Sequence, residues 1–307
     1  MSIRNRLTAV VAGGVLLALM AGVTPASAAP GDQPDPSGTL TPSIVGGQEA
    51  DRTYQAMASL QIDHNGDPNW HTCGAILVDH RHVVTNAHCV TNFPDGSAKP
   101  AASFHLRIGS RDRTQGGVVA GVTQVLPHAE WAWAQIPDVR VADIAVLRLD
   151  RYVPLQPLDI ASYLAGQAAV TRLLGWGLTD PAHGGSTSIQ LRQLDTTLVG
   201  AEMCAHAAIS VGEICVGNVN DTEGPCNGDS GGPAMQKHDH RWFAVGGASR
   251  ETAPLCGVGP AVYTDLTYYR GWINKVTRTD KVPPAATSGG TRPHLAEAQQ
   301  LRWVLAA

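Results

Sequence analysis

Short apolar runs alternate with turn residues along most of the chain, from Ile44 to about Asp265. This spacing is typical of an antiparallel sandwich or barrel, in which each strand is brief and is followed by a tight connection. The pattern predicts strands at residues 56–62, 73–78, 82–85, 104–108, 118–126, 144–149, 168–174, 212–216 and 242–248.

A different period appears only near the end of this region. From Leu266 to Val276, the residues Tyr269, Trp272 and Ile273 recur at spacings of three and four with Val276. That period places them on one face of a helix. We therefore expect a terminal helix that docks on the strands.

The two ends of the chain do not fit a packed domain. Arg4 and Arg6 precede a short apolar run that closes with small residues, which predicts a secretory signal peptide over residues 1–28. An uncleaved membrane anchor is the alternative. Residues 29–43 are rich in Pro, Gly, Ser and Thr and predict an extended propeptide, and residues 278–307 predict a flexible C-terminal extension.

Composition narrows the functional class. The 307 residues include 22 Lys plus Arg against 26 Asp plus Glu, a net charge of -4, so no basic excess favours nucleic acid or an anionic membrane. We expect a secreted, extracellular monomer that has no membrane contact once the signal peptide is removed.

Export changes the interpretation of the cysteines. The six cysteines form no C-x-x-C pair, which disfavours a zinc ribbon or a thioredoxin motif. An even number in an oxidising compartment allows complete pairing, although the spacing leaves many connectivities open.

Three segments carry candidate chemistry. His88 follows an apolar run within Thr85-Asn86-Ala87-His88-Cys89, Asp143 begins another run, and Ser230 lies among glycines in Gly228-Asp229-Ser230-Gly231-Gly232. Each feature alone has an ordinary explanation: a surface histidine, a strand cap and a tight turn. Found together, in the order histidine, aspartate, serine and in a β-rich secreted chain, the three features are much stronger evidence for a catalytic site than any one of them alone.

These segments, together with Ile44-Val45-Gly46-Gly47, resemble the trypsin/chymotrypsin-like serine peptidase family, in a secreted, bacterial-type form. The resemblance extends from Ile44 to about Val276. It implies an all-β fold of two antiparallel six-stranded β-barrels, at about 44–155 and 156–265. The active site would lie between the barrels, with a C-terminal α-helix completing a peptidase domain at 44–277.

The resemblance also implies a serine endopeptidase that acts on protein or peptide substrates without a cofactor or metal. Ser230 would be the nucleophile, His88 its general base and Asp143 the group that orients the imidazole. The backbone N–H groups of Gly228 and Ser230 would bind the oxyanion.

The same resemblance implies a zymogen. Cleavage before Ile44, by another protease or by the enzyme itself, would free an α-amino group that pairs with Asp229. By family pattern, the disulfides would join Cys73 with Cys89, Cys204 with Cys215, and Cys226 with Cys256.

The expected substrate pocket departs from the best-known members. Gly224 occupies the place where trypsin-like enzymes carry an aspartate, and the opposite wall reads Ser249-Arg250-Glu251, with Ala261 further along. Glu251 and Ala261 add bulk, which predicts a small, apolar P1 residue, or a basic one if Glu251 points inward. Alternatively, Arg250 and Glu251 are solvent-facing loop charges and only Gly224 shapes the pocket.

Two other classes of function remain. The H-x-H pairs His80/His82 and His238/His240 allow a metal enzyme, although neither has the H-E-x-x-H spacing. A catalytically inactive binding protein on the same scaffold is the other alternative. Inhibition by a chelator would favour the first, and failure of a serine-directed reagent to label Ser230 would favour the second.

Overall fold

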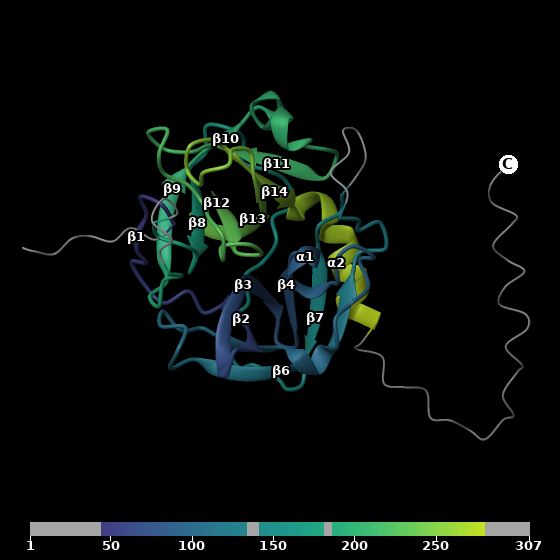
Figure 1. Cartoon of the computed structure of the whole chain (residues 1–307). Coiled ribbons are helices and arrows are strands. Elements are labelled where there is room, and N and C mark those ends of the chain that lie inside the picture. Colours follow the sequence, from purple (N-terminus) through teal and green to yellow (C-terminus); the bar gives the residue numbers. More distant parts are fainter. Residues whose placement is uncertain (1–43, 134–140, 181–185, 280–307) are drawn as a thin grey trace, which may run out of the picture. The chain divides into compact units, whose positions relative to one another are not determined.

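The computed structural model describes residues 44–133, 141–180 and 186–279, and these residues form an antiparallel all-β fold with a C-terminal helix (Figure 1). The predicted signal peptide, the propeptide and residues 280–307 of the predicted extension lie outside the described residues.

The first sheet closes into a six-stranded barrel in the order β2-β3-β4-β7-β6-β5. Its interior is almost wholly apolar, with Leu60, Leu77 and Leu106 fully buried at its centre. The strands are β2 (Met57–His64), β3 (Asp67–Asp79), β4 (His82–Thr85), β5 (His105–Ile108), β6 (Val118–Pro127) and β7 (Ala145–Leu149).

The second sheet is curled and has eight strands in the order β1-β9-β8-β12-β13-β14-β11-β10. A second core packs on it around Leu173, Val245 and Tyr263. Its strands are β1 (Gln48–Glu49), β8 (Thr171–Gly175), β9 (Arg192–Thr196), β10 (Leu198–Val199), β11 (Glu213–Val216), β12 (Pro233–His238), β13 (Arg241–Glu251) and β14 (Ala261–Asp265).

The predicted fold class is confirmed, with one difference in the second half. Six strands are predicted there, and the sheet has eight because the two-residue strands β1 and β10 extend its two edges. The pattern of apolar runs also does not predict strands β9, β12 and β14. In β9 and β12, the polar residues Gln193 and Gln236 are buried and satisfied by hydrogen bonds, so polarity hides the strand period.

Three short helical segments and one long helix complete the described chain. They are α1 (Ala87–Val90), η1 (Ala101–Ser103), η3 (Ala201–Ala207) and α2 (Leu266–Thr279). Helix α2 ends three residues beyond the predicted Val276, and its residues Tyr269 and Ile273 are buried beside Ile144. It therefore docks as expected.

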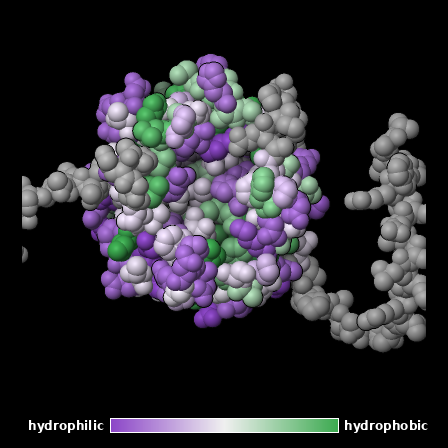
Figure 2. Space-filling view, viewed as in Figure 1, coloured by the Kyte–Doolittle hydropathy of each residue, from purple (hydrophilic) through white to green (hydrophobic). Residues whose placement is uncertain are grey.

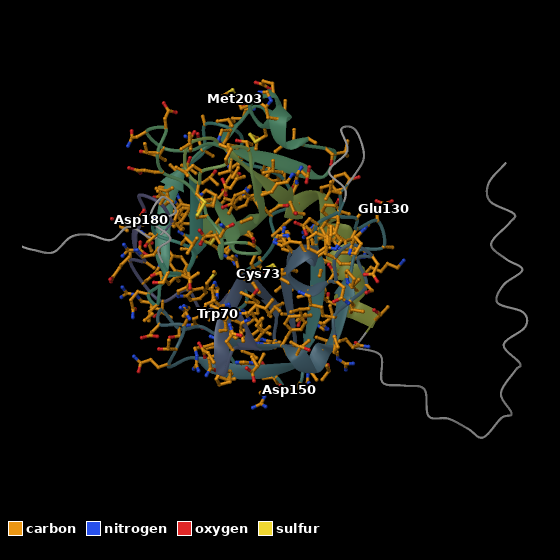
Figure 3. All side chains as sticks on the ribbon, viewed as in Figure 1. Trp70, Cys73, Glu130, Asp150, Asp180 and Met203 are labelled. Carbon is orange, nitrogen blue, oxygen red and sulfur yellow. A yellow bond between two sulfur atoms is a disulfide. The ribbon has the colours of Figure 1, made fainter. Side chains whose placement is uncertain are left out.

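Three disulfides are present, one in the first half of the domain and two in the second. They are the pairs that the resemblance implied: Cys73–Cys89, Cys204–Cys215 and Cys226–Cys256. Figure 3 labels Cys73 near the middle of the molecule, with Trp70 and Asp150 on the closed barrel and Met203 on η3. Among the described residues, no helix has the length and apolar character needed to cross a membrane.

Candidate active site

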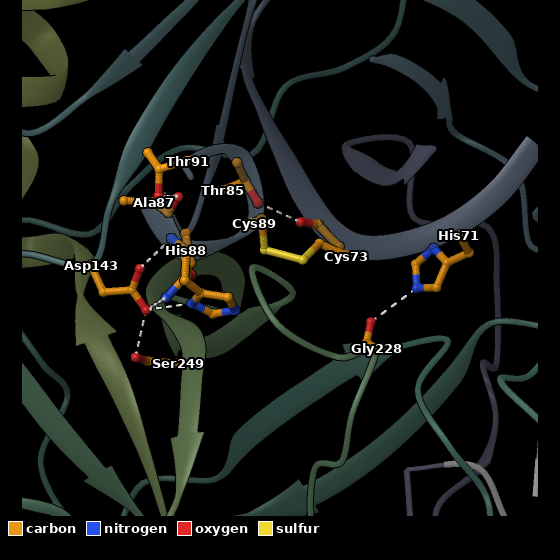
Figure 4. The surroundings of a disulfide bond; sticks show 12 residues. His71, Cys73, Thr85, Ala87, His88, Cys89, Thr91, Asp143, Gly228 and Ser249 are labelled. Carbon is orange, nitrogen blue, oxygen red and sulfur yellow. Dashed lines mark hydrogen bonds and ion pairs between the residues drawn. A yellow bond between two sulfur atoms is a disulfide. The ribbon is translucent and has the colours of Figure 1, made fainter. Parts of the chain in front are cut away.

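His88 lies on the single-turn helix α1, which follows the fully buried strand β4. Its Nδ1 lies 2.7 Å from Oδ2 of Asp143, and its backbone N–H donates to Oδ1 of the same carboxylate at 3.0 Å. The structure therefore brings two of the three predicted residues into direct contact across 55 positions of sequence (Figure 4).

The Asp143 carboxylate is 2% exposed and accepts from more than His88. Asn86 Nδ2 donates to Oδ2 at 2.9 Å, and Ser249 Oγ donates to the same oxygen at 2.7 Å. Burial alone would raise the pKa of Asp143, but the charge of His88 and these hydrogen bonds outweigh it and lower the pKa to about 2. Sequence reasoning missed Asn86 as a partner and assigned Ser249 only to the pocket wall.

This geometry fixes the histidine tautomer. A carboxylate only accepts, so Nδ1 of His88 carries the proton and Nε2 is left as the basic nitrogen of the neutral ring. Burial would lower the pKa of His88, but the charge and hydrogen bond of Asp143 dominate and raise it. The arrangement can accept a proton on Nε2.

A hydrogen bond from His71, a residue that sequence reasoning missed, stabilises the turn at Gly228. Gly228 has φ +97°, and its carbonyl accepts a 2.9 Å hydrogen bond from Nε2 of His71, whose Nδ1 lies 2.8 Å from Ser59 Oγ. Burial lowers the pKa of His71 to about 4, so the ring is neutral and the Ser59 hydroxyl donates to it. Nothing in the apolar pattern marks His71, because its partner is 157 residues away.

Ser230 lies where the two sheets meet. Its carbonyl accepts a 2.7 Å hydrogen bond from the N–H of Gly74 in β3, and the N–H of Gly231 donates to Ala248 in β13 at 2.9 Å. A side chain at Gly231 would strike Gly74 O and Thr85 Oγ1 and crowd the backbone of Asn86, two residues before His88. Only glycine permits the serine loop to approach the histidine segment this closely.

Asp229 is buried to the same extent as Asp143 but has different partners. Its carboxylate accepts from the N–H groups of Gly177 and Cys226 at 2.8 and 2.9 Å. Burial raises the pKa of Asp229 to about 7, and these two hydrogen bonds only partly oppose it. No ion pair of Asp229 occurs within the described ranges.

Ile44 is 1% exposed and packs in the core of the second sheet. Its φ is +43°, an unusual conformation for a β-branched residue. Val45 pairs with Gly224, whose N–H donates to the Val45 carbonyl at 3.0 Å. The segment that follows residue 43 is thus paired, through an isolated β-bridge, with the segment that precedes the serine loop.

A small cavity of about 60 Å³ opens beside Ser230. Glu251 and Ala261 lie opposite each other in the β13–β14 register, and both line it. Gly224 is not among the residues that line it; this glycine packs against the backbone of Gly257, which a Cβ at position 224 would approach to 3.2 Å. Burial, and then the charge of Asp229, raise the pKa of Glu251 to about 8.

Arg250 and Glu251 are not solvent-facing loop charges. The Arg250 guanidinium forms an ion pair with Glu213, with one N–O distance of 2.9 Å, and donates to the carbonyls of Ala207 and Ala208. Both side chains of this pair are largely buried. These contacts, with Glu251 on the wall of the cavity beside Ser230, do not favour the alternative in which only Gly224 shapes the pocket.

A cluster of potential metal ligands includes His88. Among the described residues, the ligand atoms of Cys73, His88 and Cys89 lie close enough together to hold an ion, but the two cysteines are bonded to each other. Of the H-x-H histidines, His82 contacts Asp79 and His80 contacts the Val153 carbonyl. None of these contacts among the described residues supports a metal site.

Comparisons with known proteins agree on one relationship. The family model described as Trypsin matches residues 44–273. Granzyme M of Homo sapiens is 31% identical over 76% of this chain and 89% of its own length. Trypsin eta of Drosophila melanogaster is 30% identical over 66% of this chain and 76% of its own length, and "Trypsin, alkaline B" of Manduca sexta is 29% identical over 75% and 89%.

Proposed function

The chain belongs to the trypsin family and is a serine-type endopeptidase, and from that premise we propose that Ser230, His88 and Asp143 form its catalytic triad. The observation that supports this most strongly is the 2.7 Å contact between His88 Nδ1 and Asp143 Oδ2, which leaves Nε2 of His88 available as a base. The relatives above come from animals, so a bacterial-type subgroup is not part of the proposal.

In the proposed reaction, His88 Nε2 takes the proton of the Ser230 hydroxyl as its Oγ attacks the scissile carbonyl. Asp143 stabilises the His88 imidazolium. Because the pKa of Asp143 is about 2, its carboxylate stays ionised at neutral pH. His88 then protonates the leaving amine. In the second half of the reaction, His88 accepts a proton from the water that attacks the acyl-enzyme and returns a proton to Ser230 Oγ.

The oxyanion of the tetrahedral intermediate would be bound by the N–H groups of Gly228 and Ser230. Two features support this assignment. The N–H of Leu178 donates to the Asn227 carbonyl at 2.8 Å, which fixes the peptide that carries the Gly228 N–H, and the Gly228 carbonyl accepts a hydrogen bond from His71, which fixes the next peptide at a positive φ of Gly228. A preorganised donor of this kind contributes about 3 kcal/mol to transition-state stabilisation in other hydrolases.

We also propose that the chain is a zymogen activated between Ser43 and Ile44. A buried carboxylate whose pKa is raised to about 7 lacks a cation, and a new α-amino group at Ile44 would supply one to Asp229. Cleavage would also abolish the φ torsion at Ile44, which stands at +43° and costs on the order of 1–3 kcal/mol.

For the substrate, we propose a small, uncharged P1 residue. The cavity beside Ser230 has only about 60 Å³, and Glu251 and Ala261 close it. With a pKa of about 8, Glu251 is mostly protonated at neutral pH and presents little fixed charge to a basic P1 residue. A basic P1 selected by ionised Glu251 remains the second candidate, since the carboxyl group does line the cavity.

The disulfides fit an oxidising compartment, so the proposal includes secretion after removal of residues 1–28. The peptidase domain would then be residues 44–277, with 29–43 acting as the propeptide. Protein or peptide substrates and an activating protease, which is the enzyme itself if small P1 residues suffice, are the partners that this model requires.

A serine-directed fluorophosphonate tests the proposal. One label per chain is expected on Ser230 in the form that starts at Ile44, none in Ser230→Ala, and markedly less in a chain whose Ser43–Ile44 bond cannot be cut. Ser188→Ala is the matched control, since that serine lies outside the proposed site and should leave labelling unchanged. Absence of labelling in the cut form would favour an inactive binding protein.

A further inference from the structure

A second cavity, distinct from the pocket beside Ser230, opens between the two sheets. It has a volume of about 240 Å³ and draws its walls from both halves of the molecule. Met57 and Ile76 come from the closed barrel, Leu174, Met235 and Trp242 come from the second sheet, and Leu158 comes from the connection between them. The face drawn in Figure 2 mixes hydrophilic and hydrophobic residues, whereas this lining is mainly apolar.

The cavity lies directly behind the serine loop. Pro233, three positions after Ser230, is part of its wall. Met57 is a second link, because its terminal methyl lies 3.3 Å from the position of a Cβ on Gly74, and Gly74 donates the hydrogen bond to the Ser230 carbonyl. A molecule in the cavity would thus press on two groups that hold the Ser230 peptide.

The size and lining of the cavity indicate a class of ligand. A cavity of roughly 150 Å³ holds one benzene ring, so about 240 Å³ suits two fused rings. Two methionine side chains and the Trp242 ring provide polarizable surface for an aromatic molecule.

The charges at the cavity favour an anion. Arg52 is part of the wall, and the cations of Arg172 and Lys237 lie 5.1 and 4.9 Å from the centre of the Trp242 ring. Asp51 and Asp195 pair with Arg172, and Asp51 also lies 3.5 Å from Arg52. The described groups here thus include one more cation than carboxylate.

We propose that this cavity binds a small two-ring aromatic carboxylate and that its occupancy raises the reactivity of Ser230. Filling the space behind Pro233 and Met57 restricts backbone motion on the carbonyl side of Ser230, and through this residue it limits the motion of the neighbouring N–H groups of Ser230 and Gly228 that would bind an oxyanion. The binding part stands on the cavity alone, and only the coupling part rests on the proposed function.

The binding part is tested in Ser230→Ala protein by calorimetric titration with 2-naphthoate. Saturable binding of one molecule per chain is expected, with quenching of fluorescence that is lost in Trp242→Phe. Arg52→Ala should weaken 2-naphthoate about tenfold and leave the neutral analogue 2-naphthylmethanol unchanged, and Arg270→Ala on α2 is the matched control. Absence of saturable binding, or equal weakening by both arginine variants, would overturn the site.

The coupling part is tested in the cut enzyme by the rate of fluorophosphonate labelling. Saturating 2-naphthoate should raise this rate about threefold to tenfold. Leu158→Trp, which fills the cavity, should remove the effect of the ligand, and Tyr163→Trp, an exposed position, should keep it. A slower rate that persists in Leu158→Trp would show that the ligand binds beside Ser230 and would overturn the coupling. If labelling fails in every condition while calorimetric binding remains, the proposed function is at fault and the cavity site stands.

Discussion

The regions around Asp143 and Asp229 bury an aspartate equally, at 2% exposed, yet the pKa values of the two carboxyls move in opposite directions. Asp143 meets His88, Asn86 and Ser249 and has a pKa of about 2. Asp229 meets two backbone N–H groups and has a pKa of about 7. Burial therefore destabilises the ionised form of both carboxyls, and only a partner of opposite charge compensates for that destabilisation.

Neutralising Asp143, the carboxyl with a charged partner, should have the greatest effect on activity. Asp143→Asn keeps the volume but offers Nδ1 of His88 a mixed donor and acceptor, so the wrong tautomer becomes accessible. We expect kcat to fall about 10,000-fold, because the histidine base then spends most of its time in the unproductive tautomer. Steady-state hydrolysis of a peptide amide measures it.

Asp159→Asn is the control for that change, since Asp159 is exposed and pairs only with Arg241 within the described residues. A loss of less than tenfold in Asp143→Asn would show that His88 does not depend on this carboxylate.

The next change removes the uncompensated carboxyl. In the form that starts at Ile44, Asp229→Asn would leave the buried α-ammonium without its partner and cost about 3–5 kcal/mol of unfolding free energy. In the uncut chain at pH 8, the same change should stabilise the fold, because it removes a buried carboxylate. Denaturant unfolding measures the change in the free energy of unfolding that Asp229→Asn causes in each form. Equal destabilisation of the cut and uncut forms would contradict the ion pair.

The two carboxyls should also give the unmutated protein opposite dependences of stability on pH. The folded pKa of Asp229, about 7, lies above its ordinary value of 3.8, so the folded state binds the proton more tightly. The uncut chain should therefore lose on the order of a few kcal/mol of stability as pH rises from about 4 to 7. Glu251 extends the loss towards pH 8, since its pKa is raised from 4.5 to about 8.

Asp143 has the opposite sign. Its folded pKa of about 2 lies below 3.8, so its contribution is present above pH 4 and is lost as pH falls towards 2. Urea unfolding at several pH values distinguishes the two, and the form cut before Ile44 should show a much flatter profile between pH 4 and 7. Identical profiles for cut and uncut protein would count against the activation pair.

A more modest change, in substrate preference, is expected from substitutions in the cavity beside Ser230. Glu251→Ala should enlarge the cavity beside Ser230 and raise kcat/KM about tenfold for a medium-sized apolar P1 residue relative to alanine. In the unmutated enzyme, cleavage after Arg or Lys should rise relative to alanine between pH 7 and 9, as Glu251 ionises. Glu202→Ala, at an exposed position, is the matched control for a peptide-library profile.

Much of the architecture could be predicted from the chain alone. The run at residues 82–85 matches β4 at both ends, and the period from Leu266 predicts α2. Strands β9 and β12 could not be found in this way, because Gln193 and Gln236 are buried through hydrogen bonds to distant groups. A local pattern records only which side chains are apolar.

The candidate site divides in the same way. The segments around His88, Asp143 and Ser230 are recognisable because each carries its chemistry within a few residues. His71 and the ion pair of Arg250 with Glu213 are not, since each joins positions far apart in the sequence. The bulk that Glu251 and Ala261 add was expected, but their position on one cavity depends on the β13–β14 register.

The sequence by itself determined the strand-rich fold, the residue types needed for acyl transfer and an even set of cysteines. The tertiary structure decided which charges are compensated, because a pKa depends on the groups within a few ångströms and not on neighbours in sequence. That is why two aspartates that look alike in the chain differ so widely in the fold: one faces a histidine, and the other accepts from two backbone N–H groups and lies near the like charge of Glu251.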